Sequence, residues 1–195
     1  MAQPDSTDEE SWEAWWDDRL VAMVSVLGNH DGQVSHSPVP FEFGYDAGGR
    51  ADVVHFREHV AGVVYATCEL IGCDEQVKNS LGNYELAICH RGTERWGAEL
   101  ISRLAYYTLE AQLEPGSTMD LGPAVRPGSA ITAFLFVEFG RFRVRDRAAG
   151  LLLCIGITAD ELAHCRNHRR AEVEAALISK GVYPFTDLER GSVFV

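Results

Sequence analysis

The most continuous run of hydrophobic residues lies at positions 151–157, where almost no polar side chain interrupts the chain. A run of this length without alternation is typical of a strand that is covered on both faces. Thr158 and Glu161 follow with capping-box spacing, in which each side chain bonds the backbone N–H of the other residue. The pattern therefore predicts a buried strand that leads directly into a capped helix, and Gly181 supplies the stop of that helix.

The end of the chain is predicted to complete this strand and helix as one folding unit. A turn is expected at residues 183–185, which read Tyr-Pro-Phe, and a closing strand over residues 186–195. Within this segment, Asp187 and Arg190 are candidates for a structural ion pair or a turn contact, with direct recognition of a partner as the alternative. No catalytic motif occurs in this unit.

Two amphipathic helices are predicted nearer the N-terminus. The first is an acidic helix over residues 1–28, with a capping-box pattern at Thr7 and a stop at Gly28. Its hydrophobic positions predict that it docks on the body of the domain, with contact to a partner as the alternative; they are Trp12, Trp16, Leu20, Met23, Val24 and Leu27. The second helix spans residues 94–112 and must end before Pro115, because the residue before a proline avoids helical angles.

The remaining hydrophobic segments have the length and composition of strands. They lie at residues 52–56, 62–70, 84–89, 118–121 and 130–138, and residues 141–145 alternate strictly, as an edge strand with one wet face does. Residues 29–50 are rich in turn formers and predict a long loop with a short extended piece near residues 41–43. Together these elements predict one α+β domain over residues 1–195, with a mixed, largely antiparallel sheet and about three helices packed on it.

Composition and charge narrow the classes of function. The chain is 46% hydrophobic and 24% charged, as ordinary globular proteins are, and it has no apolar run long enough to span a membrane. Its N-terminus is acidic, unlike a secretory signal, which predicts a cytoplasmic protein. The net charge of −12 argues against a nucleic-acid ligand and is compatible with a basic protein partner, although acidity also serves solubility alone.

Histidine, cysteine and carboxylate side chains are the candidates for metal binding or catalysis in this chain. His164, His168 and Glu172 have the i, i+4, i+8 spacing of one helical stripe and could ligate zinc, but this stripe lies opposite the hydrophobic side, so an exposed polar face is the preferred interpretation. Cys89 and His90 are adjacent on a predicted strand and point to opposite faces, so they cannot form a thiol–imidazole pair. No cofactor is therefore expected, and a small metal-dependent or Cys/His hydrolase is kept as the rival function.

Basic residues gather in one place in this acidic chain. Every second position from Arg141 to Arg147 is an arginine. We expect these side chains to pair with carboxylates on neighbouring strands or to protect a sheet edge, with contact to an anion or a partner as the alternative.

The ordered set of motifs resembles the Suppressor of fused-like domain family over residues 62–195. Gly82-Asn83-Tyr84-Glu85-Leu86 leads through Trp96 to Leu104-Ala105-Tyr106-Tyr107 and Leu113-Glu114-Pro115-Gly116-Ser117. The C-terminal half adds Ile155-Gly156-Ile157-Thr158-Ala159-Asp160-Glu161-Leu162 and Thr186-Asp187-Leu188-Glu189-Arg190-Gly191-Ser192-Val193.

The resemblance implies a non-enzymatic protein-binding module of the bacterial, stand-alone type. Many such proteins are suspected immunity proteins that neutralise polymorphic toxins, and the acidity of this chain would suit a basic toxin domain. A regulatory scaffold that binds another protein is the alternative. The candidate partner-binding residues are Trp96, Asp187 and Arg190, which belong to the motifs that carry the resemblance.

Overall fold

The computed structural model describes residues 6–92, 94–122 and 125–194, except for the side chains of residues 6–13 and of Tyr45. Its helices are α1 (Ser6–Leu27), α2 (Trp96–Leu104), α3 (Ala159–Arg166) and α4 (Arg170–Ser179), with short 3-10 helices η1 (Phe41–Phe43), η2 (Tyr45–Ala47) and η3 (Ala105–Leu109). Its strands are β1 (His30–Ser35), β2 (Val53–Phe56), β3 (Val63–Thr67), β4 (Asn83–His90), β5 (Thr118–Asp120), β6 (Ile131–Val144) and β7 (Arg147–Thr158).

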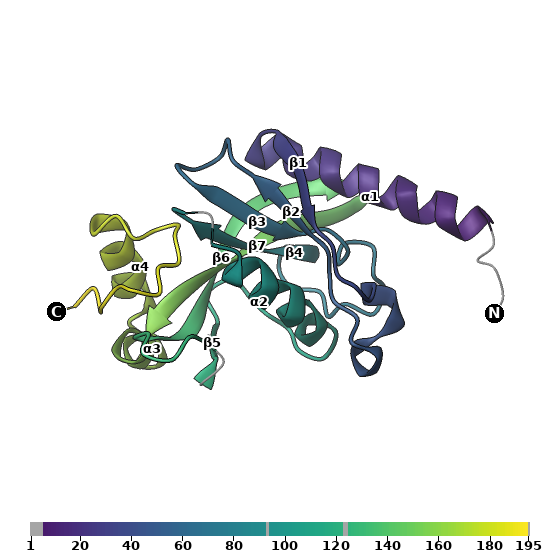
Figure 1. Ribbon diagram of the computed structural model, residues 1–195. Helices are drawn as coiled ribbons and strands as arrows, with labels where there is room; N and C mark the ends of the chain where they lie inside the picture. Colours follow the sequence, from purple (N-terminus) through teal and green to yellow (C-terminus); the bar gives the residue numbers. More distant parts are fainter. Residues whose placement is uncertain (1–5, 93, 123–124, 195) are drawn as a thin grey trace.

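The seven strands form one mixed sheet in the order β1-β2-β3-β4-β7-β6-β5. This sheet lies in the middle of the molecule, with α1 toward one end and α3 and α4 toward the other (Figure 1). Strands β1 to β4 pair antiparallel in sequence order, and β5, β6 and β7 form a second antiparallel group. The two groups meet where β4 pairs parallel with β7. This arrangement confirms the predicted α+β class with a mixed, largely antiparallel sheet.

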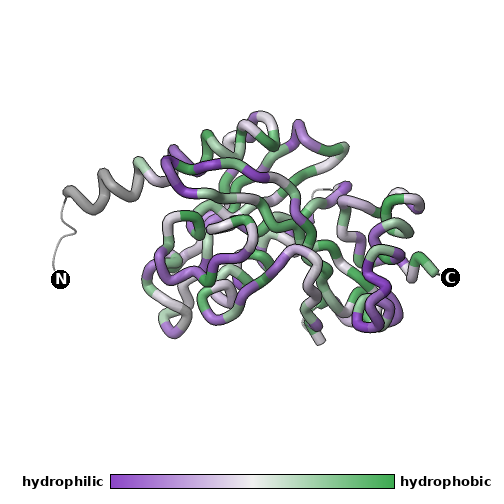
Figure 2. Tube along the Cα trace, turned by 180° about the vertical axis from the view of Figure 1, so that it is seen from behind, coloured by the Kyte–Doolittle hydropathy of each residue, from purple (hydrophilic) through white to green (hydrophobic). Residues whose placement is uncertain are grey.

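Helices cover both faces of the sheet, which explains why its central strands are hydrophobic without alternation. On β4, Ala87 and Cys89 belong to the core beneath α1, α3 and α4, whereas Leu86 and Ile88 belong to the core beneath α2. The hydrophobic segments run through the middle of the molecule in Figure 2. The run at residues 151–157 is β7, buried on both sides as predicted.

Helix α1 is held to the sheet by hydrophobic packing and by one buried arginine. Met23 and Leu27 are fully buried, as the predicted docking of this helix requires. Arg19, which the hydrophobic pattern did not reveal, is 6% exposed and donates from Nε to the carbonyl of Ile71 at 2.5 Å. The predicted contacts of Trp12 and the capping box at Thr7 lie outside the described side chains.

The stripe of arginines after residue 140 contacts this helix. Arg145 and Arg147 both place their guanidinium groups over the ring of Trp15, at 4.0 and 5.3 Å from its centroid. They also form ion pairs with Asp18 and Asp74, which lie on α1 and in the loop between β3 and β4, so these arginines pair with carboxylates but not with the neighbouring strands that were predicted to supply them. Within the described ranges, no helix combines the length and the hydrophobicity that crossing a membrane requires.

Four details of the predicted elements were wrong. Residues 141–144 form a strand with alternating exposure as predicted, but they continue β6 and are not a separate strand, because a bulge near Phe139 lets β6 keep its pairing with β7. The loop at 29–50 contains β1 and two 3-10 helices. The helix predicted from Thr158 to Gly181 is two helices, α3 and α4, separated by a turn in which His168 has φ 61°. Residues 186–194 form no strand and run as an irregular tail.

Buried carboxylates cluster beneath α1, near the start of β2 and in β4. Glu85 is fully buried and accepts hydrogen bonds from the Thr67 hydroxyl and from two backbone N–H groups. Glu69 accepts the backbone N–H of Asp52 at 2.6 Å. Burial raises the pKa of Glu69 to about 7, and the charges of Asp52 and Glu85 add to that rise.

This cluster predicts a loss of stability as the pH rises. Between about pH 4.5 and pH 7 the folded chain holds a proton on Glu69 that the unfolded chain has released, so the free energy of unfolding falls across this range. Glu69→Gln keeps an acceptor for the Asp52 N–H and removes the charge. We expect it to stabilise the protein by about 2 kcal/mol at pH 8 and by far less near pH 5.

Urea unfolding at the two pH values measures the difference, and Glu75→Gln, at an exposed carboxylate, is the control. Parallel pH profiles for wild type and Glu69→Gln would contradict the prediction.

Candidate functional site

The C-terminal tail inserts between the two central strands where they separate. Strands β4 and β7 pair from Asn83 to Ala87 on the β4 side, and beyond that point Thr186 lies between them. Its backbone N–H donates to the carbonyl of Cys89 on β4 at 2.9 Å. Its hydroxyl accepts the N–H of Gly156 at 2.8 Å and donates to the carbonyl of Cys154 at 3.1 Å, both on β7. The tail therefore satisfies backbone groups that a strand pair would otherwise satisfy.

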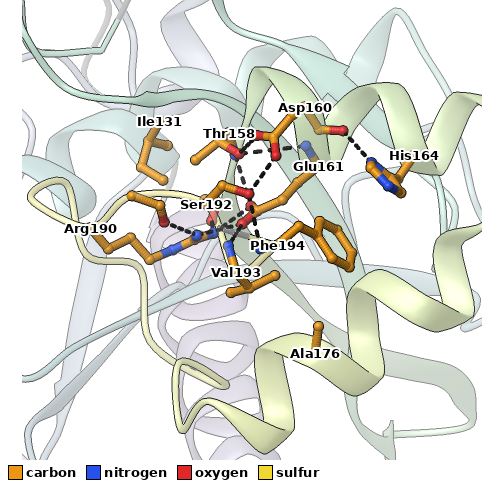
Figure 3. Close-up of polar contacts among 12 residues, drawn as sticks. Ile131, Thr158, Asp160, Glu161, His164, Ala176, Arg190, Ser192, Val193 and Phe194 are labelled. Atoms are coloured by element: carbon orange, nitrogen blue, oxygen red, sulfur yellow. Dashed lines mark hydrogen bonds and ion pairs between the residues drawn. The ribbon is translucent and has the colours of Figure 1, made fainter.

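A buried ion pair holds the next part of the tail. Glu161 is fully buried at the start of α3, where it completes the predicted capping box with Thr158. Its two carboxylate oxygens also accept Nη1 and Nη2 of Arg190, each at 2.7 Å, and Oε1 accepts the N–H of Val193 at 2.8 Å. Arg190 Nη2 further donates to the carbonyl of Gly156 at 2.7 Å. Figure 3 shows these groups pointing toward one another from α3, β7 and the tail.

Contacts around this ion pair fix the last described residues. The hydroxyl of Ser192 donates to the carboxylate of Asp160 (Figure 3). The ring of Phe194 stacks on that of His164, with centroids 4.3 Å apart. His164 also bonds the carbonyl of Asp160 through Nδ1 at 2.8 Å. The tail is therefore attached to the first turns of α3 at several independent points.

A hollow of about 270 Å³ lies between this tail and the start of α2. Trp96 and Asp187 both line it, so the structure brings these two candidate residues together from positions 91 residues apart. Arg190 does not line it, because its side chain is 9% exposed and bonds Glu161. Asp187 makes a turn contact by accepting the N–H of Glu189 at 2.9 Å. Recognition of a partner by these residues stays a prediction.

Two further residues of this hollow were missed from the sequence. Arg126 forms an ion pair with Glu189, and both residues line the hollow. His90 also lines the hollow, and the centroid of its ring lies 4.5 Å from that of the Trp96 ring. Burial lowers the pKa of His90 to about 4, so its imidazole is neutral near pH 7. The sequence drew attention to His90 only as the neighbour of Cys89, and its place at the end of a buried strand was the one signal for its position beneath this hollow.

The residues considered for metal binding do not assemble. His164 lies on α3, His168 lies in the turn after it, and Glu172 on α4 pairs with Arg169. Across the described part of the chain, no group of three or more histidine, cysteine or carboxylate residues could hold a metal ion. The candidate stripe was therefore wrong as a single helical face, because the helix breaks at His168.

The cysteines are unsuited to nucleophilic chemistry. All five are free thiols, and Cys68, Cys89 and Cys154 are buried. Burial raises the pKa of each of these three thiols, so that they stay protonated at neutral pH, and the thiolate is the form that attacks. This arrangement gives no support to the rival Cys/His hydrolase.

The fold and this site define an α+β domain whose structured C-terminal tail closes one end of a mixed sheet. Residues 50–191 match the family described as Suppressor of fused protein (SUFU). Because the match spans well over half of the chain, this chain belongs to the SUFU family. No curated protein matches the chain significantly.

Several solved structures have the same fold at low sequence identity. A chain of the Sufu–Fu complex has a TM-score of 0.69 and 16% identity, over 94% of this chain and 92% of that one. A putative SUFU homologue from Neisseria gonorrhoeae has a TM-score of 0.63 and 17% identity, over 95% of this chain and 97% of that one. Drosophila Suppressor of Fused has a TM-score of 0.57 and 14% identity over 91% of this chain, which spans 51% of its length. Such identities establish the fold alone.

Proposed function

We propose that this chain is a protein-binding domain without catalytic activity, and that it neutralises a polymorphic toxin by stoichiometric binding in the cytoplasm. The observation that carries the proposal is membership in the SUFU family, together with the likeness to a Sufu chain solved in complex with Fu. The buried thiols and the separated histidines support a role without bond chemistry.

The electrostatics of the chain favour a basic partner. With a net charge of −12, the protein attracts a positively charged domain and speeds its encounter. Carboxylates on its surface could occupy the phosphate site of a nuclease toxin. The hollow between Trp96 and Asp187 offers an aromatic side chain and a carboxylate together, a combination that suits a basic or aromatic side chain of the partner.

The test is co-expression with the toxin encoded beside this gene. We expect the chain to restore growth and to elute with the toxin as a complex of defined stoichiometry. Trp96→Ala should weaken the complex by about 30-fold, since truncating an aromatic anchor costs about 2 kcal/mol. Ile178→Ala removes an exposed hydrophobic residue on α4 and serves as the control. Circular dichroism verifies that both variants fold.

Three outcomes would contradict the proposal in different ways. Failure to bind the neighbouring toxin would count against the immunity role. A stable complex with a protein other than a toxin would favour the regulatory scaffold. An equivalent of zinc in the purified protein would favour the metal-dependent hydrolase.

A further inference from the structure

The arginines of this acidic protein differ in what their side chains contact. Nine form ion pairs with carboxylates, namely Arg57, Arg126, Arg141, Arg145, Arg147, Arg166, Arg169, Arg170 and Arg190. Arg19, Arg91 and Arg143 donate to main-chain carbonyl groups. Among the described residues this leaves Arg50, Arg95 and Arg103, whose guanidinium groups have neither an ion pair nor a hydrogen bond.

All three unpaired arginines line one groove of about 490 Å³, which we call the arginine groove. One wall is residues 34–38, at the end of β1 and in the turn that follows, and the other wall is α2. Arg95 is the N-cap residue of α2 and Arg103 lies in the last turn of this helix, so the two arginines stand near opposite ends of the same wall. Glu99 is the only carboxylate among the described residues that line the arginine groove.

The walls of the arginine groove are fixed to the same short segment before β2. Ser102 on α2 donates from its hydroxyl to the carbonyl of Ala51 at 2.6 Å. On the opposite wall, the carboxylate of Asp52 accepts the N–H of Ser37 at 2.8 Å and bonds Nδ1 of His36 at 2.6 Å. The groove is therefore formed before any ligand arrives, which reduces the entropy that binding must overcome.

The arginine groove continues into a second, larger hollow. Arg50 and Arg103 also line this neighbouring space of about 1080 Å³. It carries hydrophobic side chains and two carboxylates, namely Leu100, Leu104, Leu121, Tyr107, Asp46 and Glu110. Cationic and hydrophobic positions thus follow one another over a surface much longer than a single phosphate or carboxylate ion.

We propose that the arginine groove binds an acidic segment of a partner protein, whose carboxylates contact Arg50, Arg95 and Arg103 and whose hydrophobic residues enter the neighbouring hollow. Guanidinium groups recognise carboxylates through paired hydrogen bonds, and these three have no such partner among the described residues of a chain that has 29 acidic residues. The inference rests on the proposed protein-binding function and names the chemistry of one contact surface. A partner that is basic as a whole can carry such a segment.

The test uses the full chain and a fluorescent oligoglutamate peptide as the probe, titrated by anisotropy at low and high salt. We expect saturable binding that weakens with salt. Arg50→Gln and Arg103→Gln should each weaken it about three- to tenfold. Glu99→Gln should tighten it, because the competing carboxylate is removed. Arg143→Gln makes the same change in net charge at an exposed arginine on β6 and should leave the affinity unchanged.

Specific outcomes would overturn the inference. An equal loss in Arg143→Gln would mean that the peptide senses only the net charge. Absence of saturable binding, or full competition by inorganic phosphate at similar concentration, would remove the acidic segment as the ligand. If the toxin complex forms and survives all the groove variants, this surface is not the contact, while the proposed function stands. If the peptide binds as expected and the toxin does not, the proposed function fails separately.

Discussion

Arg190→Ala is expected to lower the free energy of unfolding by about 3–5 kcal/mol, because it leaves the fully buried carboxylate of Glu161 without its counter-ion. The same change removes the hydrogen bond to the carbonyl of Gly156 and frees the tail from β7. Urea unfolding monitored by circular dichroism measures the loss. Hydrogen exchange should show that amides near Val193 lose protection.

Two further variants separate the ion pair from other causes. Arg126→Ala breaks the exposed pair with Glu189 and should cost at most about 1 kcal/mol. Adding Glu161→Gln to Arg190→Ala removes the uncompensated charge, and the double variant should recover about 1–2 kcal/mol of the loss. A cost for Arg190→Ala no larger than that of Arg126→Ala would show that the buried pair contributes little.

Gly82→Ala is expected to cost about 3 kcal/mol or more, since two independent penalties coincide at this position. Gly82 has φ 94°, a conformation that L side chains rarely adopt, and an added Cβ would lie 2.2 Å from the carbonyl oxygen of Ala148. That oxygen belongs to the backbone just inside β7, so relief requires the parallel pairing of β4 and β7 to shift.

The matched control for this variant is Gly181→Ala. Gly181 has φ 66°, and no atom lies within 4 Å of the Cβ that would be added. Its cost should be about 1 kcal/mol, from backbone strain alone. Thermal and urea unfolding of the two variants give the comparison, and equal losses would refute the steric contribution at Gly82.

Elements whose sequence signal lies within a few neighbouring residues were predictable from the sequence. Residues 151–157 are hydrophobic throughout because β7 is central and covered on both faces, and the capping box between Thr158 and Glu161 spans only four positions. The break at His168 had only the weak signal of Asn167, the C-cap of α3, because the turn contains neither glycine nor proline. It directs α4 so that Val173 and Leu177 reach the core, and packing outweighed helical propensity there.

The C-terminal tail and the candidate sites depend on contacts between distant segments, which local sequence patterns did not predict. Alternation within residues 186–195 could not show that Thr186 would sit between β4 and β7 in place of a strand. The pairing of Trp96 with Asp187 in one hollow, and of Arg50 with Arg95 in one groove, joins segments that are remote along the chain.

The amino-acid sequence by itself determined α1, the buried strand β7, the fold class and the acidic character of this protein, because hydrophobic period, capping and charge act between neighbouring residues. Only the tertiary structure decided which charges meet. Glu161 finds Arg190 29 residues away, whereas Arg50, Arg95 and Arg103 find no carboxylate among the described residues. The physical reason is that electrostatic partners are chosen by distance in space, which the topology of the sheet sets.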